Sequence, residues 1–312
     1  EVTAEQEVIF FMPVAMKKAG LPTASRLMQY WLFAGAPPPY ESVAADPNEG
    51  PPSPRSGAPV QYDGRPIYVV SYRRLSESSS LLRHAETQAK SPMVAEFVRR
   101  RIARLPAPGG SKIDEQWARV VRDASKAPVG SSIAVGKLDQ WIEPELHVAT
   151  YTIGPEATAI SAAVGGPSER DAALGSHGLK IYVAGTVTRR ADHLEYSFDR
   201  RGMRIFDPFD FIGAQPLGAW SVERGMLSGW LALAKPALAQ AQYEGRGGVA
   251  DDGFVSLTND SFHRFSREFL PRYNRVRGAL PPLRCLDLYV ATTMNIDVLV
   301  KPFTMKGPLA DT

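Results

Sequence analysis

The sequence contains very little cysteine, since Cys285 is the only one among 312 residues. A single thiol cannot form a disulfide within the chain, and it excludes a zinc site made of several thiolates. The five histidines show no metal-ligand spacing either, so we do not expect a zinc enzyme. Cysteine use is compatible with both reducing and oxidising compartments.

Long apolar runs are also missing, because no stretch approaches the roughly 18–20 uninterrupted apolar residues of a membrane-spanning helix. The segment from Met16 to Ala36 superficially resembles a secretion signal, but fifteen residues precede it and Pro22, Arg26 and Gln29 interrupt it. We interpret this segment as ordinary structure and expect no transmembrane segment.

The chain has no large excess of charge of either sign, because 36 Lys and Arg against 33 Asp and Glu leave a net charge of +3. Arginines at positions 99–101 and 104 form one basic helix face, but stacking aromatic residues are missing nearby. We interpret this face as solvated surface and expect no nucleic-acid partner.

The composition is that of a folded protein, with 44% hydrophobic and only 22% charged residues. The 26 glycines and 26 prolines indicate many turns, which disfavours a helical bundle. A chain of this length has room for one or two domains and a sizeable core.

The N-terminal part is predicted to be helical. A helix is expected after Pro22 and before Gly35, because one face carries apolar residues at helical spacing: Ala24, Leu27, Met28, Trp31 and Leu32. We assign residues 1–36 to an N-terminal helical segment. Residues 37–60 are rich in proline and glycine and are interpreted as a linker or insert.

Residues 61–129 are expected to hold one strand and two helices. The run RPIYVVSYRRL from Arg65 has the β-branched and aromatic content of a strand. Ser91 and Ser111 can each cap a following helix with one apolar stripe.

Residues 130–312 are expected to form an antiparallel β-rich domain, because short runs of alternating pattern are separated by turn residues. We predict a hairpin with a turn at 200–202 and a returning arm at 203–206. A helix from Ser221 to about Ala234, a short helix around Phe265 and one or two closing strands at 286–300 are also predicted. The fold class is therefore α+β, with a helical N-terminal region and a β-rich C-terminal domain that would carry any catalysis.

Two aspartates at a predicted strand end form the most promising chemical cluster. Asp207 and Asp210 lie three residues apart in the segment FDPFDF, where they can converge on one cation or divide acid and base roles. The alternative is structural, with the aspartates forming turns around Pro208 and the phenylalanines filling the core. Spacing alone favours this structural alternative.

Three residues further along the chain could complete such a site. Arg224, expected early in the helix after Trp220, and Arg264 carry forked donors that suit phosphate. His263 can transfer a proton near neutral pH. A lone histidine is more often structural or simply exposed.

Several phrases together resemble one bacterial family: FFMPVAMKKAGLPTASRLMQYWLFAG, GLKIYVAGTV, DPFDFIGAQPLGAWS and NDSFHRF. This is the domain-of-unknown-function family 6402, typically encoded beside type VI secretion spike proteins. The resemblance implies a cargo or accessory protein of a contractile secretion machine. Expected partners are a spike protein or carrier and a cognate immunity protein.

The DPFDF segment is also similar to the Asp-x-Tyr-Asp-Phe signature of colicin M-like bacteriocins, which cleave the lipid-linked peptidoglycan precursor with magnesium. Asp207 and Asp210 take the places of the signature aspartates, while Phe209 replaces the tyrosine. The first arginine after Asp210 is Arg224, farther along than in the signature. The similarity implies that Mg²⁺ is held by Asp207 and Asp210.

Two functions follow as expectations. The first is a secreted antibacterial effector, made in the cytoplasm, that hydrolyses a phosphoester bond of the lipid-linked precursor in the periplasm of a target bacterium. The second is a non-enzymatic adaptor or spike-associated protein, for which an exposed stripe of Met28, Trp31 and Leu32 would supply the contact.

Overall fold

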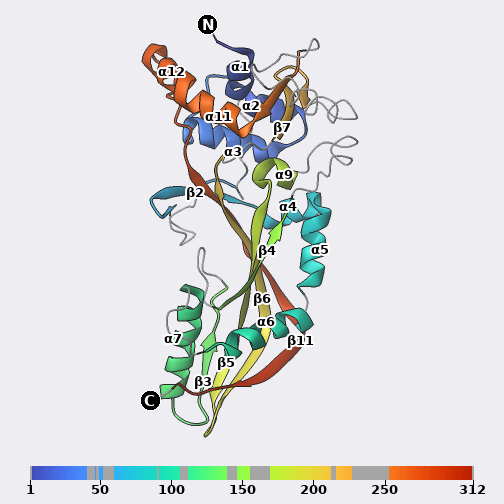
Figure 1. The fold of residues 1–312 in the computed structure, drawn as a ribbon, viewed down its shortest axis with the longest axis vertical. Coiled ribbons are helices and arrows are strands. Elements are labelled where there is room, and N and C mark those ends of the chain that lie inside the picture. The colour runs from blue at the N-terminus through green and yellow to red at the C-terminus, as the bar shows by residue number, and fades with distance from the viewer. Residues whose placement is uncertain are drawn as a thin grey trace.

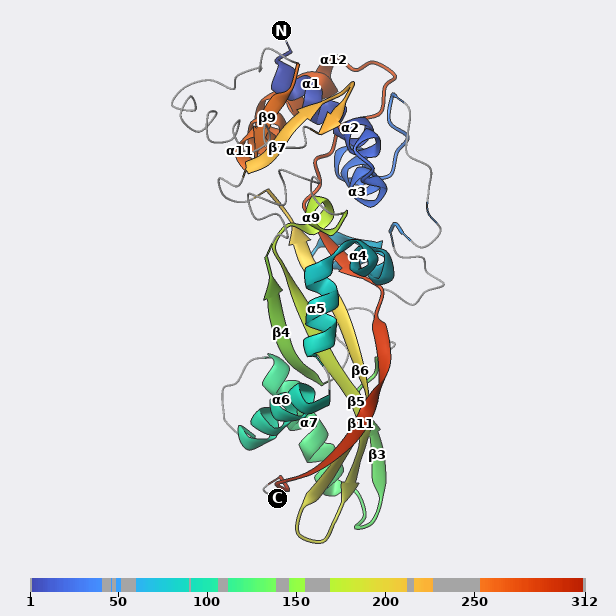
Figure 2. The ribbon, with the colours of Figure 1, turned by 90° about the vertical axis from the view of Figure 1, so that its right-hand side faces the viewer.

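A computed structural model describes residues 2–40, 46, 49–51, 60–89, 91–105, 112–138, 146–154, 169–211, 216–226 and 253–310. The molecule is elongated, with helices and a small sheet gathered at one end and a long twisted sheet running to the other (Figures 1 and 2). The chain begins at the helical end and finishes near the far end of the long sheet.

The described helices in chain order are α1 (Ala4–Phe10), α2 (Met12–Lys18), α3 (Pro22–Phe33), α4 (Tyr72–Ser78), α5 (Ser80–Gln88), α6 (Ser91–Ala103), α7 (Lys112–Lys126), α9 (Glu169–Leu174), α11 (Asn259–Arg264), the π-helical turn η2 (Phe265–Phe269) and α12 (Leu270–Val276). The helices expected after Pro22, Ser91 and Ser111 are thereby confirmed. The short helix expected around Phe265 is also present, and Pro271 follows its π-helical turn.

The described strands are β1 (Gln61–Tyr62), β2 (Arg65–Val70), β3 (Ser132–Val135), β4 (His147–Ile153), β5 (His177–Arg189), β6 (Leu194–Phe209), β7 (Pro216–Ser221), β8 (Gly225–Met226), β9 (Val255–Thr258), β10 (Leu288–Thr292) and β11 (Asn295–Gly307). A large sheet contains β1-β2-β10-β6-β5-β3, with β11 also on β6 and β4 also on β5. Its pairings are antiparallel except for that of β2 with β10. A separate small sheet has the order β8-β7-β9.

The long antiparallel pair of β5 and β6 runs through the large sheet from Arg189↔Leu194 to Leu179↔Ile205. Each strand has two partners in succession along its outer edge. On β5 these are β3 and β4, and on β6 they are β11 and β10. The predicted hairpin with a turn at 200–202 is therefore wrong. Residues 200–202 continue β6, because they pair with β5 on one side and with β11 on the other. The chain turns earlier, between the end of β5 and the start of β6.

The main core fills the space between the large sheet and the helices α5, α6 and α7 on one of its sides (Figure 2), and it continues among the N-terminal helices. Trp117 of α7 is fully buried and its indole N–H donates to the carbonyl oxygen of His147 at 3.0 Å. Tyr196 and Phe198 of β6 are fully buried against the same helices, as their alternation predicts. The predicted apolar stripes of α6 and α7 face this core.

The N-terminal helices pack with α11 and the small sheet at the other end of the molecule. Thr3 caps α1, and its side chain accepts a hydrogen bond from the Gln6 amide at 3.2 Å. The stripe of Met28, Trp31 and Leu32 is almost completely buried in the main core. The helix α3 therefore does not present this stripe as a docking surface.

Three sequence expectations need correction or fall partly outside the described residues. Ser221 ends strand β7 and Gly225 begins β8, so the helix predicted from Ser221 does not begin there, and positions 227–234 lie outside the described residues. The strand at Arg65 ends at Val70, since Ser71 caps α4 instead. Most of the predicted linker at 37–60 also lies outside the described residues.

The fold class is α+β, as predicted, with helices in the N-terminal part and a large, mainly antiparallel sheet towards the C-terminus. The one or two closing strands expected at 286–300 are β10 and β11, of which β11 continues beyond the predicted end to Gly307. None of the described helices combines the length and apolar character needed to cross a membrane.

The pairing of β5 with β6 requires a glycine where the two backbones approach most closely. A Cβ atom added to Gly185 would lie 2.0 Å from the Ser197 carbonyl oxygen, whereas one added to Gly154 meets nothing within 4 Å. We expect Gly185→Ala to lower the free energy of unfolding by about 1–3 kcal/mol or more, because backbone must shift. Urea unfolding of this variant and of Gly154→Ala checks the expectation; equal stabilities would contradict it.

Candidate functional site

The two candidate aspartates lie where the β5–β6 pair ends. The last β5 partner of β6 is Leu179, opposite Ile205, and beyond it Asp207 pairs with Val290 of β10. Asp210 follows directly after the end of β6. Both side chains are half-buried, so the segment is neither a core strand nor an open loop.

Burial raises the pKa of the Asp207 carboxyl from its ordinary value of 3.8 to about 6. Three smaller effects are included in this value: a hydrogen bond from the Gly178 backbone N–H lowers the pKa, the negative charge of Asp210 raises it, and the charge of Lys180 lowers it. The two aspartates therefore lie within electrostatic reach of each other. A carboxyl that titrates near neutral pH can either donate or accept a proton in a reaction.

Lys180 is the cation that the structure places beside this pair, and the sequence reasoning missed it. It lies on β5 opposite Arg204 of β6, and its Nζ is 5.0 Å from the centre of the Phe206 ring. The sequence did contain one indication of its role: a charged residue lies inside GLKIYVAGTV, a strand whose other side chains are mostly buried. Lys180 and Asp207 are 27 positions apart, and only the pairing of β5 with β6 brings them together, so the sequence alone did not predict that they are neighbours.

The aromatic residues of the FDPFDF segment connect it to two distant helices. Phe211 stacks on Phe262 of α11 with ring centres 4.0 Å apart and planes inclined by 8°. Trp31 of α3 contacts both rings edge-on, at 5.1 Å and 5.8 Å. Phe209 in turn contacts Phe211 at 5.3 Å. The phenylalanines thus have the packing role that the structural alternative predicted, while the aspartates remain at the edge of this cluster.

Arg224 lies in the turn between β7 and β8 and is exposed. Its backbone N–H donates to the Ser221 hydroxyl at 3.4 Å, and its guanidinium carbon is 5.6 Å from the centre of the Phe254 ring. This position differs from the early helical turn that we expected.

Arg264 and His263 lie on α11 with different surroundings. The Arg264 guanidinium forms an ion pair with Glu5 of α1 at 2.8 Å, and the Ser261 hydroxyl donates to the same carboxylate at 2.7 Å. Arg264 thereby fastens α1 to α11. His263 is exposed.

The structure thus joins Asp207 with Asp210 and adds Lys180, but it does not place Arg224, His263 or Arg264 among the groups that act on Asp207. Within the described ranges, no three His, Cys, Asp or Glu side chains converge as metal ligands. Magnesium bound by one or two carboxylates commonly completes its coordination with water and substrate phosphate.

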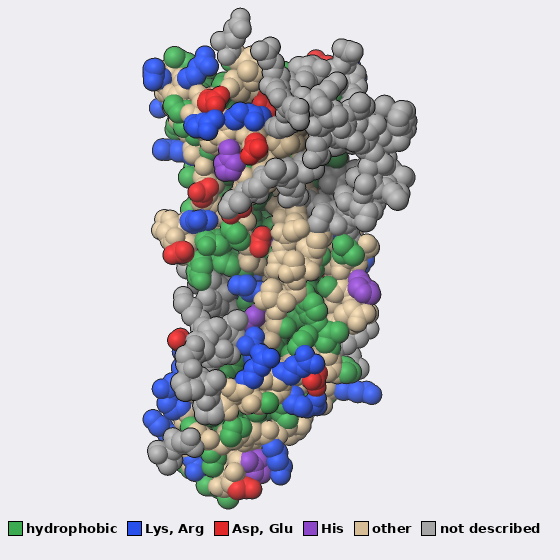
Figure 3. Space-filling view, in the orientation of Figure 1, with side chains coloured by type: hydrophobic (Ala, Val, Ile, Leu, Met, Phe, Trp, Pro, Cys, Tyr) green, Lys and Arg blue, Asp and Glu red, His purple; other side chains and the backbone are tan. Residues whose placement is uncertain are grey.

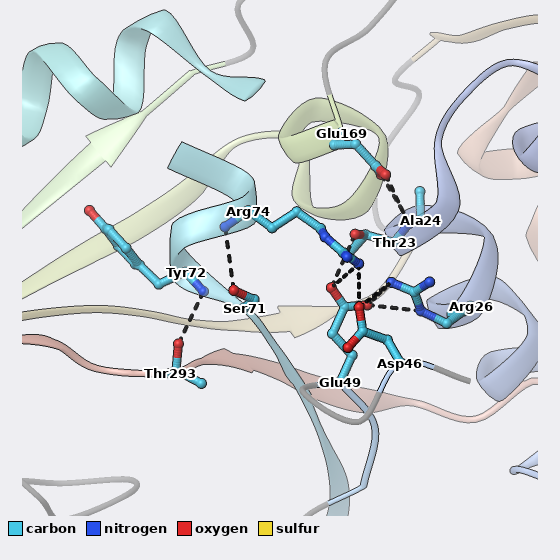
Figure 4. A network of polar contacts seen from close by, with 10 residues as sticks. All are labelled: Thr23, Ala24, Arg26, Asp46, Glu49, Ser71, Tyr72, Arg74, Glu169 and Thr293. Carbon is cyan, nitrogen blue, oxygen red and sulfur yellow. Dashed lines mark hydrogen bonds and ion pairs between the residues drawn. The ribbon is translucent and has the colours of Figure 1, made fainter. Parts of the chain in front are cut away.

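A second polar cluster surrounds the completely buried carboxylate of Glu49 (Figure 4). This carboxylate accepts hydrogen bonds from Arg26 Nε at 2.9 Å, from Arg26 Nη2, from Arg74 Nη1 at 3.1 Å and from the Thr23 hydroxyl at 3.2 Å. Asp46 adds an ion pair to Arg74 at 2.7 Å. Glu49 is held in place by the bridge that its neighbour Gly50 makes with Val69 of β2.

This Glu49 cluster is structural in character, because two guanidinium groups balance two carboxylates and the buried oxygens are supplied with donors. It ties α3, through Thr23 and Arg26, to α4, through Arg74. Glu169 of α9 strengthens the same junction, since its carboxylate accepts from the Thr23 and Ala24 amides at the start of α3. A carboxylate at a helix N-terminus is favourable for the exposed amides and the helix dipole.

A cavity of about 260 Å³ lies between α6 and the end of β11 and is lined by Arg99, Ile102, Leu105, Met305 and Lys306, among others. In the sheet register Lys306 pairs with Glu195, at the opposite end of β6 from Asp207. The cavity is therefore separate from the aspartate pair.

Fold and site together describe an α+β protein with a carboxylate pair at one end of a long twisted sheet. A family model matches residues 9–269, and its description is a family of unknown function, DUF6402. The chain belongs to this family. Neither the curated proteins nor the solved structures contain a significant match to the chain.

The Glu49 cluster makes a prediction about stability. We expect Glu49→Gln to lower the free energy of unfolding by about 3–5 kcal/mol, because it leaves buried guanidinium charge uncompensated. The matched control is Glu77→Gln, which breaks an exposed pair with Arg73 and should cost less than about 0.5 kcal/mol. Chemical denaturation measures both; similar losses would show that the cluster does not hold α3 to α4.

The raised pKa of Asp207 predicts a pH dependence of stability. Because the folded pKa of about 6 exceeds the ordinary value of 3.8, the native state binds more protons between these values. The contribution of this carboxyl to stability is therefore complete below about pH 4 and is lost as pH rises to about 6.

In Asp207→Asn this loss is absent, so the variant should gain stability relative to the wild type between pH 4 and pH 7. The expected gain is on the order of 1–2 kcal/mol, since solvent screens a half-buried group. Urea unfolding of both proteins across this range measures it. A stability difference that stays constant with pH would contradict the raised pKa.

Proposed function

We propose that the protein is a secreted antibacterial effector of type VI secretion that hydrolyses a phosphoester bond of the lipid-linked peptidoglycan precursor. The observation that carries the proposal is the half-buried pair Asp207 and Asp210 beside Lys180. The similarity of DPFDF to the colicin M-like signature supports the choice of reaction. The proposed site of action is the periplasm of the target bacterium, after synthesis in the cytoplasm of the attacker.

The proposed reaction needs one base, one acid and charge compensation at the phosphate. Water adds to phosphorus, the bond between phosphorus and the leaving oxygen breaks, and that oxygen takes up a proton. Asp210 would accept the proton of the attacking water. Without a bound cation, the raised pKa of Asp207 keeps part of its population protonated near neutral pH, which suits a proton donor. With a divalent cation bound, Asp207 would be ionised as a ligand, and water would protonate the leaving oxygen.

In this proposal Lys180 takes the phosphate-binding role that we expected of Arg224 or Arg264. Its charge acts on Asp207, whereas Arg264 is engaged with Glu5. A lysine binds phosphate as a point charge without the paired donors of arginine. Arg224 and His263 are exposed and would take part only if substrate extended to α11 and the β7–β8 turn.

The donor set of the aspartate pair fits Mg²⁺, which prefers carboxylate oxygens and commonly retains water and substrate phosphate as its other ligands. The mutual repulsion that raises the pKa of Asp207 is what a bound divalent cation would relieve. When bound, magnesium would neutralise charge on the non-bridging phosphate oxygens.

The proposed partners of such an effector are a spike protein or carrier and a cognate immunity protein. The alternative proposal remains a non-enzymatic adaptor or spike-associated protein of the same machine. The burial of Met28, Trp31 and Leu32 means that an adaptor would use another surface than the α3 stripe.

The test is growth of a bacterium that expresses the protein with or without an added periplasmic signal. We expect lysis only with the signal, and loss of lysis in Asp210→Ala, because removing the carboxylate removes the base. Asp199→Ala is the matched control, since this exposed aspartate lies on the same strand, eight positions before Asp207. It should remain as toxic as the wild type.

Purified protein should then release the phosphorylated headgroup from the lipid-linked precursor, and a chelator should stop the release. Toxicity confined to the cytoplasm would overturn the proposed substrate. Absence of toxicity in both compartments from a folded protein would favour the adaptor. Full activity of Asp210→Ala would remove the aspartate pair from the mechanism.

A further inference from the structure

The helix α12 and the turn that follows it project at the outer end of the molecule (Figure 1). We call residues 270–284 the basic tip. This segment contains four arginines, Arg272, Arg275, Arg277 and Arg284, and no acidic residue, although the whole chain has a net charge of only +3. Lys and Arg side chains gather over α12 at this end in the space-filling view (Figure 3). The positive charge is therefore local.

Two aliphatic side chains stand exposed among these arginines. Val276 is 79% exposed, the largest value among the exposed large hydrophobic residues of the described chain, and Leu280 is 46% exposed. Arg272, Arg275 and Val276 have the spacing that places side chains on one helix face. A partner that covered these two aliphatic groups would remove apolar surface from water, which is favourable.

The shape of the basic tip is fixed by contacts underneath it. Asn274 binds both backbone groups of Leu283, donating to its carbonyl oxygen and accepting from its N–H at 2.9 Å each. The Tyr273 hydroxyl donates to the Pro281 carbonyl oxygen at 3.2 Å, and its ring lies 5.4 Å from that of Phe10 in α1. The exposed arginines and aliphatic groups are thus held outward by an ordered turn.

The arginines at the surface of the tip are available for an anionic partner. Arg272 and Arg275 are exposed, and neither forms an ion pair with a carboxylate of the described residues. Arg277 instead donates to the Leu280 carbonyl oxygen and so supports the turn. Cationic side chains around a projecting aliphatic pair match the surface of an anionic bilayer, where phosphates lie above the acyl chains.

We propose that the basic tip docks the protein on the surface of anionic phospholipid bilayers. Arg272 and Arg275 contact lipid phosphates, and Val276 and Leu280 enter the boundary with the acyl chains. A projecting tip fits a bilayer better than the groove-filling contact of a protein partner, and exposed aromatic rings for stacking on nucleic acid are not among its residues. The proposal rests on these residues alone and does not depend on the proposed hydrolysis.

The test measures sedimentation of the full chain with vesicles of phosphatidylcholine alone or mixed with phosphatidylglycerol. We expect binding to the mixed vesicles, weakened by salt, and little binding to phosphatidylcholine alone. Arg272→Gln with Arg275→Gln should weaken binding roughly 25-fold, because each cationic side chain near the surface contributes about fivefold. Val276→Ser with Leu280→Ser should weaken it at least about tenfold.

The matched control removes equal charge from the far end of the molecule. Arg119→Gln with Arg122→Gln changes two exposed arginines of α7, and binding should change less than twofold. Unchanged circular dichroism and melting temperature show that all variants are folded. Equal losses in the control and the tip variants, or unchanged binding of the tip variants, would overturn the proposal. So would failure of the wild type to prefer anionic vesicles, including the case in which it binds only DNA.

Discussion

The rest of the structure depends on the continuous pairing of β5 with β6. β5 has 13 residues and β6 has 16, and each carries two shorter neighbours in succession. The register of this pair shifts between Ala184 and Gly185, and there the two backbones approach so closely that a Cβ atom on residue 185 would clash with the Ser197 carbonyl oxygen. Because the helices α5, α6 and α7 pack on the sheet that this pair organises, a change in its register would move buried side chains such as Tyr196 to the opposite face.

The candidate site follows from the point where this pairing stops. Asp207 lies just past the last described β5 partner, where β6 exchanges that neighbour for β10. Backbone at such a boundary has fewer sheet partners than backbone inside the pair, so polar side chains can be partly buried without entering the core. Lys180 comes from the opposite strand at the same boundary. The sheet therefore supplies the rigid part of the site, and the stacked rings of Phe211 and Phe262 fix the chain that leaves it.

The sequence predicted those helices and strands that have a local pattern of their own. It failed for residues whose structure or surroundings depend on a strand or helix distant in the sequence. The apolar stripe of α3 and the start of α6 at Ser91 could be predicted, and so could the alternation that buries Tyr196. The sequence Arg200-Arg201-Gly202 has the composition of a turn, yet it is strand because Arg201 pairs with Asp297 of β11 and donates to α5 backbone. The aspartate pair could be proposed from its spacing in the sequence. Lys180 could not, because only the register of β5 against β6 brings it close to Asp207. Arg264 had the right chemistry, but no local signal revealed its ion pair with Glu5.

The contrast between Glu49 and Asp207 is the physical reason for placing chemistry at the latter. Glu49 is completely buried, and its oxygens receive donors from Thr23, Arg26 and Arg74. Because its oxygens already accept these hydrogen bonds, this carboxylate would gain little free energy from binding a further ligand. Asp207 receives one backbone N–H and lies near a second negative charge, so burial and repulsion both disfavour its ionised form. A proton, a divalent cation or a cationic group would each lower the free energy of this arrangement. The fold thus supplies the buried carboxylate of Glu49 with donors and leaves the half-buried carboxylate of Asp207 in a state that a ligand would stabilise, which is a property expected of a site and not of a structural ion pair.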